Sequence, residues 1–93
     1  MNEPIPGRVV ISRAGHDKGK PLLVIACGAD GMLVLADGRT RTVDKPKRKK
    51  RMHVFVTPDC LTECAEKLAE GAMPQDHEIR REIEAWEKKN RAD

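Results

Sequence analysis

Short apolar runs separated by glycine-containing turns occupy the first half of the chain and limit the folds that it can adopt. Runs such as Pro21–Cys27 and Met32–Ala36 are rich in β-branched and aliphatic residues, which is typical of strands. The spacers Asp30-Gly31 and Asp37-Gly38 end these two runs, and a glycine after aspartate supplies the positive φ that tight hairpin turns need. The pattern predicts a small, strongly bent barrel of five short strands, at residues 8–12, 21–27, 32–36, 39–43 and 52–56.

The spacing of apolar residues changes after Thr57. Thr57 or Asp59 can cap a helix that has Pro58 in its first turn, and Gly71 is expected to end that helix. The apolar residues between them recur at three- and four-residue spacing, which predicts a helix docked on the strands. We therefore expect a mainly β fold with appended helices, divided into a barrel over 1–57 and a helical extension over 58–93.

A second, acidic helix is predicted over about residues 75–90. Ile79, Ile83 and Trp86 fall on one stripe of this helix, because residues three and four apart share a helix face. The stripe is thin and the polar face is broad. This pattern indicates a helix that is either loosely docked on the barrel or reserved for a protein partner.

Charge is divided unevenly along the chain. Residues 1–57 contain 12 Lys and Arg but only 5 Asp and Glu, whereas residues 58–93 contain 6 Lys and Arg and 10 Asp and Glu. A basic first part and an acidic second part suggest that one face of the protein meets a polyanion. The length of 93 residues also limits the function, since so short a chain leaves little room for a deep, water-excluding cleft.

The residue types that carry catalysis or bind metals do not form a recognisable pattern. None of the three histidines has a Cys, Ser or paired carboxylate at the spacing that nucleophilic or metal-assisted catalysis requires. Cys60 and Cys64 share a face of the first predicted helix, where packing is the expected role of a free cysteine. A zinc site would also need Cys27 and His53. We expect no enzymatic activity, no cofactor and no metal.

Cysteine usage and hydropathy also predict where the protein acts. Three cysteines cannot all pair with one another, so a disulfide framework is not indicated. The sequence shows neither a secretory signal nor an apolar run long enough to span a bilayer. We expect a soluble, cytoplasmic protein that contacts no membrane.

The segment from Gly7 to Gly19, followed by an apolar strand, looks like a KOW motif, a strand-loop-strand unit in which a central glycine closes a loop of an SH3-like barrel. Gly15, Asp17-Lys18-Gly19 and Asp37-Gly38 agree with that pattern. Over roughly residues 5–60 the chain resembles the KOW-domain ribosomal-protein-like family of the large-subunit L-fourteen-e type. The resemblance implies a five-stranded SH3-like barrel that binds structured RNA, ribosomal RNA above all.

The residues support RNA binding by an independent physical route. Gly15 and Gly19 have no Cβ, so their loop can turn tightly and approach a phosphate chain. Lys45–Arg51 holds six cations in seven residues and is expected to be extended until a polyanion neutralises it. Asp17 is expected to organise the loop instead. The candidate RNA-binding residues are Arg13, Gly15, His16, Lys18, Gly19, Lys20, Arg39, Arg41, Lys45, Lys47, Arg48, Lys49, Lys50 and Arg51.

The scarcity of aromatic residues narrows the mode of binding. The chain has one Phe, one Trp and no Tyr, so it lacks the stacking platforms of single-strand binders, and recognition of folded RNA through backbone and shape is expected.

Other functions are compatible with the same residues. The loop glycines can simply connect two strands, and the basic run can serve as a nuclear localisation signal or a solubilising linker. A function of another class also stays open, that of a KOW-type protein-interaction module in transcription or translation with its partner at Ile79, Ile83 and Trp86.

Overall fold

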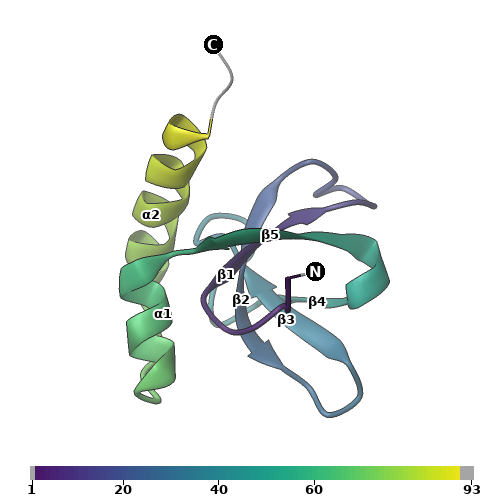
Figure 1. Ribbon diagram of the computed structural model, residues 1–93, viewed down its shortest axis with the longest axis horizontal. Helices are drawn as coiled ribbons and strands as arrows, with labels where there is room; N and C mark the ends of the chain where they lie inside the picture. The colour runs from purple at the N-terminus through teal and green to yellow at the C-terminus, as the bar shows by residue number, and fades with distance from the viewer. Residues whose placement is uncertain (1, 91–93) are drawn as a thin grey trace.

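The computed structural model describes residues 2–90, which form a curved antiparallel sheet with two helices along one side (Figure 1). The strands are β1 (Arg8–Ser12), β2 (Pro21–Cys27), β3 (Met32–Ala36), β4 (Lys47–Lys50) and β5 (Val54–Cys60). The helices are α1 (Thr62–Ala69) and α2 (Asp76–Lys89), and a short 3₁₀ helix at Arg51–His53 joins β4 to β5. The expected mainly β fold with appended helices is confirmed.

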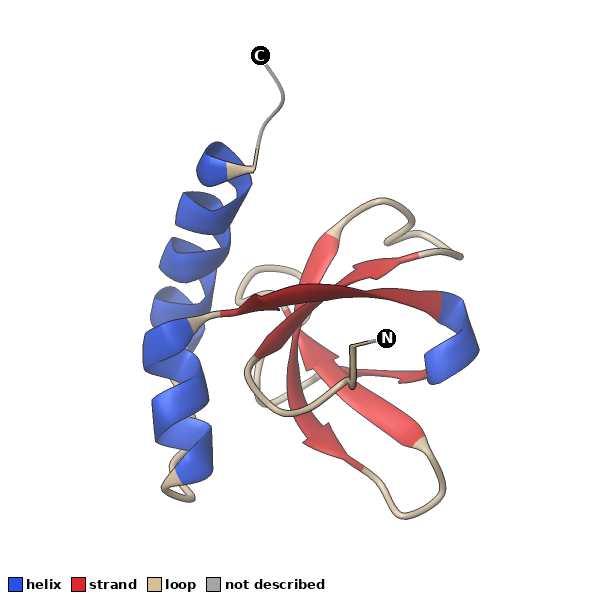
Figure 2. Cartoon of the chain, in the orientation of Figure 1, coloured by secondary structure: helices blue, strands red, loops and turns tan. Residues whose placement is uncertain are grey.

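The strands follow the order β4-β3-β2-β1-β5 in the sheet. β1 to β4 form a meander, and β5 returns to pair antiparallel with β1, with Val10 opposite Val56. The pairing register shifts once between β1 and β5 and once between β2 and β3. Irregularities of this kind bend a strand and increase its twist, and the strands curl strongly in Figure 2.

β2 is buried on both of its faces, because a hydrophobic core lies on each side of the sheet. Alternate residues of a strand point to opposite faces. Leu23 and Ile25 therefore pack in the core beneath the two helices, with Leu61, Cys64, Ile79 and Ile83. Leu22 and Val24 pack in a second core, which is formed by strands alone and also contains Val10, Leu33, Leu35 and Val54.

Two glycines allow the helices to lie directly against backbone. A Cβ atom at Gly7 would lie 2.4 Å from the Cβ of Ala65 in α1, and one at Gly38 would lie 2.3 Å from the carbonyl oxygen of Asp76 in α2. Both glycines have positive φ, 96° and 77°, which side chains disfavour. The sequence thus fixes the closest approach of each helix at a residue without a side chain.

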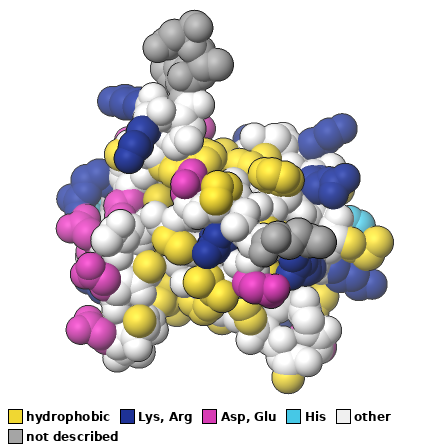
Figure 3. Space-filling model, in the orientation of Figure 1, with side chains coloured by type: hydrophobic (Ala, Val, Ile, Leu, Met, Phe, Trp, Pro, Cys, Tyr) yellow, Lys and Arg dark blue, Asp and Glu magenta, His cyan; other side chains and the backbone are white. Residues whose placement is uncertain are grey.

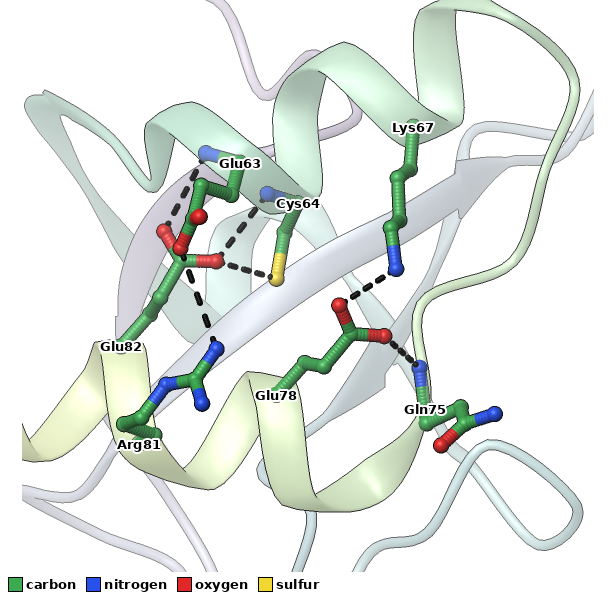
Figure 4. A network of polar contacts seen from close by, with 7 residues as sticks. All are labelled: Glu63, Cys64, Lys67, Gln75, Glu78, Arg81 and Glu82. Atoms are coloured by element: carbon green, nitrogen blue, oxygen red, sulfur yellow. Dashed lines mark hydrogen bonds and ion pairs between the residues drawn. The ribbon is translucent and has the colours of Figure 1, made fainter.

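The two helices are joined by carboxylates of α2 (Figure 4). Leu61, the N-cap of α1, provides no side-chain cap. Instead, Glu82 accepts hydrogen bonds from the backbone N–H of Glu63 at 3.3 Å and of Cys64 at 3.1 Å. These N–H groups have no acceptor within a helix, so α2 supplies the cap that α1 lacks.

Two pKa shifts follow from this packing. Burial, together with the hydrogen bond that the thiol donates to Glu82 at 2.9 Å, raises the pKa of Cys64 well above its usual range. Lys67 of α1 forms an ion pair with Glu78 of α2, and this contact lowers the pKa of Glu78. Glu78 also accepts a hydrogen bond from the backbone N–H of Gln75 at 2.9 Å, in a capping box at the start of α2.

The prediction of a strand at residues 39–43 is wrong, and the fourth strand instead comes from the basic run. The Asp37 carboxylate accepts hydrogen bonds from the N–H groups of Arg39 and Arg41, both at 2.8 Å, which folds this segment into a loop. The free edge of β3 is paired instead by Lys47–Lys50, with Leu33 opposite Lys49. The run is thus an ordered strand rather than an extended linker.

The predicted start of the first helix is also wrong. β5 extends to Cys60 and contains Pro58, so the first helix starts at Thr62 and not at Thr57 or Asp59. β5 forms the end of the sheet, and proline is tolerated there because it does not have to donate to a neighbouring strand. Cys60 consequently lies in a strand and is exposed, whereas Cys64 is buried in α1.

The apolar stripe of α2 is docked on the sheet, which is one of the two alternatives that the sequence leaves open. Ile79 and Ile83 are buried in the core beneath the helices. Trp86 is half-buried against the same core, and its Nε1 donates a hydrogen bond to Asp59 at 2.8 Å. The thin stripe therefore docks α2 on the sheet, and the surface expected for a protein partner is already covered.

Within residues 2–90, neither helix has the length and the apolar character that a membrane span requires.

Candidate nucleic-acid interface

Residues 13–20 form an ordered loop between β1 and β2, held by its own backbone. The N–H of Gly19 donates to the carbonyl of Ser12 at 2.8 Å, and the N–H of Lys20 donates to that of Asp17 at 2.9 Å. Gly15 and Gly19 have φ of 80° and 84°, the conformation that glycine adopts without strain. The side chains of Arg13, His16, Lys18 and Lys20 all belong to exposed residues of this loop.

Lys49 attaches the basic strand β4 to this loop. Its Nζ donates a hydrogen bond to the carbonyl oxygen of Ala14 at 2.7 Å, and the residue is only 8% exposed. Lys49 lies opposite Leu33, a residue of the strand-only core, so its aliphatic stem continues that apolar face. The two sequence features chosen as RNA-binding elements, 35 residues apart, are therefore neighbours.

Arg41 attaches a second loop, residues 37–46, to loop 13–20. Its Nε and Nη2 donate to Oδ2 of Asp17 at 3.1 and 3.0 Å, and the Asp17 side chain is 5% exposed. Asp17 thus organises the loop, as expected, but through a distant arginine. The same segment is tied to α2, because the N–H of Val43 donates to Oδ1 of Asp76 at 2.8 Å.

Four of the predicted RNA-binding cations have partners within the protein. Lys49 and Arg41 are held by Ala14 and Asp17, as described above. Arg39 forms an ion pair with Glu84 of α2. Arg51 contacts Glu3 at 3.5 Å and the carbonyl oxygen of Asn2 at 3.2 Å. Of these four, Lys49 and Arg41 are the more buried and hold segments together, whereas Arg39 and Arg51 form exposed contacts.

The other predicted RNA-binding side chains make no ion pair or hydrogen bond within residues 2–90. They are Arg13, His16, Lys18 and Lys20 of the first loop, Lys45 of the second loop, and Lys47, Arg48 and Lys50 of β4. Alternation divides β4, since Lys47 and Lys49 point to one face and Arg48 and Lys50 to the other. The basic run therefore presents two short rows of charge rather than one cluster.

On the face drawn in Figure 3, Asp and Glu side chains and Lys and Arg side chains are distributed unevenly. In Figure 3 most Asp and Glu side chains lie over the helices at the left, and Lys and Arg side chains gather at the right over the far end of the sheet. Some Lys and Arg side chains also accompany the helices. The charge division along the chain thus becomes a division in space, which can orient the protein toward a polyanion.

The chain matches no protein-family model and no curated protein. Within residues 2–90, no three His, Cys, Asp or Glu side chains are grouped as ligands of a metal ion.

The sequence analysis did not predict that two apolar residues near the cations are exposed. Met52 is 71% exposed and Phe55 is 58% exposed, and both lie close to the start of β5. The alternation of β5 could have predicted the exposure of Phe55. Val54 and Val56 are expected to point into the core, so the residue between them must point outward. Met52 gave no such signal, since it was expected inside a strand.

Proposed function

We propose that the protein is a cytoplasmic, ribosome-associated RNA-binding protein whose curved sheet is an SH3-like barrel of the KOW type. The observation that carries the proposal is the contact between Lys49 and Ala14. It joins loop 13–20 to β4, and both of these segments carry exposed cations. A surface of this kind binds phosphate chains by releasing their counterions.

The strand arrangement supports the barrel assignment. A four-stranded meander with the last strand returning to β1, curled around a core formed by strands alone, is the arrangement expected of a small five-stranded barrel. In this proposal loop 13–20 is the KOW loop. Gly15 allows the loop backbone to approach RNA, and Lys18, Lys20, Arg48 and Lys50 supply phosphate contacts.

The target is folded RNA of the kind found in ribosomes. Cations on a rigid sheet and an ordered loop match a fixed arrangement of phosphates, whereas an unstructured strand has to be ordered on binding. About four phosphate contacts at once predict a slope of roughly −3 to −4 for the logarithm of the binding constant against the logarithm of salt concentration. The carboxylates of the helical side would face away from the RNA.

Crosslinking in cells tests the proposal. The tagged protein is irradiated with ultraviolet light, and the attached RNA is sequenced, in parallel with an Arg48→Gln/Lys50→Gln variant. The matched control is Lys88→Gln/Lys89→Gln, which removes the same charge from exposed residues of α2. We expect one peak on a helix or junction of ribosomal RNA that is lost in the β4 variant and kept in the control.

Binding in vitro gives the expected size of the effect. Loss of two phosphate contacts weakens affinity for the crosslinked RNA about 30-fold at 0.15 M salt, since each contact contributes roughly fivefold there. Equal binding by both variants would overturn the proposal. Lysines on β4 would then serve only to protect an end strand from pairing with another molecule, and the β4 variant would aggregate more readily than the control.

A further inference from the structure

An open hollow with a volume of about 630 Å³ lies at the start of β5. Its lining is largely apolar and comes from the N-terminal segment, the residue after β1, the 3₁₀ helix and the first residues of β5. The lining residues are Asn2, Arg13, Arg51, Met52, Val54, Phe55 and Val56. The volume falls within the range of about 300–1,000 Å³ that is usual for sites of small molecules.

Phe55 gives this hollow an exposed aromatic ring. It lies opposite Ile11 in the pairing of β5 with β1, and it is 58% exposed, whereas its neighbour Val54 is buried. β5 pairs with β1 and forms the end of the sheet. A large apolar side chain kept in contact with water beside other exposed apolar groups is typical of a binding site.

Two arginines line the same hollow as the ring. The backbone N–H of Arg13 donates to the carbonyl of His53 at 2.9 Å, which holds Arg13 next to the start of β5. Its guanidinium has no hydrogen-bond or ion-pair partner within residues 2–90. Arg51 also lines the hollow and contacts Asn2 and Glu3. An aromatic ring next to a guanidinium matches a nucleotide, whose base stacks on the ring and whose phosphate binds the cation.

We propose that the hollow takes one unpaired base of an otherwise double-helical RNA, stacked on Phe55 with its phosphate on Arg13. The inference rests on the proposed function and specifies its target. A single ring can stack a single base, so the RNA that fits has a bulged or terminal nucleotide beside a stem. The stem binds the cations of loop 13–20 and β4. The unpaired base gives the protein a preference that phosphate contacts alone cannot give.

Two RNA hairpins test this inference. They share one stem, and one of them carries a single bulged 2-aminopurine, whose fluorescence falls when it stacks. We expect the protein to bind the bulged hairpin about tenfold more tightly than the fully paired one, since base stacking on an aromatic ring is worth roughly 1–3 kcal/mol. Binding should also quench the probe.

Variants separate the base site from the phosphate contacts. Phe55→Leu keeps an apolar side chain and removes the ring, so it should lose the tenfold preference and the quenching but keep the affinity for the paired hairpin. Arg48→Gln/Lys50→Gln should weaken both hairpins equally and keep the preference.

The possible failures are distinguishable. If neither hairpin is bound, the proposed function itself is overturned. If the paired hairpin is bound but the bulge brings no preference, or if Phe55→Leu retains the preference, the base site is overturned and RNA binding stands. In the last case the hollow and the end strand β5 would suit a peptide that adds a strand to the sheet.

Discussion

The helical side and the basic end of the sheet differ in what their charged groups contact. On the helical side, Asp76, Glu78 and Glu82 all accept hydrogen bonds from other parts of the chain. On the basic end, Lys18, Arg48 and other exposed cations have no such partner within residues 2–90. Charges of the first kind hold elements together, and charges of the second kind are available to a ligand. The net charge along a sequence does not distinguish structural charges from charges available to a ligand, because the distinction depends on contacts in the folded protein.

The largest effect is expected where α2 meets the sheet loops. Gly38→Ala places a Cβ 2.3 Å from the Asp76 carbonyl oxygen at a residue with φ of 77°, and strain plus overlap should cost about 3 kcal/mol. Gly31→Ala is the control, because φ is 84° there and no atom lies within 4 Å, so about 1 kcal/mol is expected. Urea denaturation measures both. Equal losses would show that α2 does not lie against Gly38.

The next largest loss of stability is expected when a carboxylate that holds the two helices together is removed. Glu82→Ala deprives α1 of its N-terminal acceptor and should lower the free energy of unfolding by about 1 kcal/mol, the usual cost of a lost helix cap. Glu87→Ala on an exposed position of the same helix should change it by less than about 0.5 kcal/mol. A difference smaller than the error of urea denaturation would contradict the capping role.

A smaller, pH-dependent effect is expected from the ion pair of Lys67 with Glu78. The pKa of Glu78 is lowered in the folded protein, so its contribution to stability is present above the pKa of the unfolded chain, about 4.3. That contribution is lost as pH falls through the lowered pKa. Lys67→Met should therefore be less stable than the wild type at pH 7, and the two should converge in acid. Urea midpoints between pH 7 and pH 3 measure this, and a constant gap would refute the assignment.

The smallest effect on stability is expected at the basic end of the sheet. Arg48→Gln/Lys50→Gln removes two exposed side chains without partners in the described part of the chain, so the free energy of unfolding should change by less than about 0.5 kcal/mol. Thermal and urea unfolding would detect a larger change. A loss above about 1 kcal/mol would break the comparison, since these cations would then belong to the structure as Lys49 does.

The sequence predicted the strands that are buried on both faces and the helix whose apolar residues recur regularly at three- and four-residue spacing. β2 and β3 begin and end as expected, because their residues fill two cores and need uninterrupted apolar runs. α2 differs from its prediction by one residue at each end, since its N-terminal capping box and its three- and four-residue spacing are local features. Gly31 and Gly38 also have the positive φ that was expected of the two Asp-Gly turns.

The errors have a common cause, which is that distant partners outweigh local preference. Lysine-rich segments rarely form strands, yet Lys47–Lys50 does so because β3 offers an unpaired edge. Arg39–Val43 has the alternation of a strand, but Asp37 draws two of its N–H groups into a turn.

The sequence predicted the loop and the basic run of the candidate site. It did not predict which of their cations are held by partners within the protein. Lys49 and Arg41 carry the same charge as their neighbours, and only contacts across 35 and 24 residues distinguish them. No local feature of the sequence encodes such contacts.

The position of β1 between β2 and β5 has a consequence for how the chain folds during its synthesis. β2 and β3 are joined by a tight turn and can pair as soon as both are made. β1 emerges first but lacks one neighbour until residue 60 is available, and pairings across so long a separation form slowly because loop closure costs entropy. The loop that follows β1, with its exposed cations, is therefore presented to surrounding polyanions before the sheet that supports it is complete.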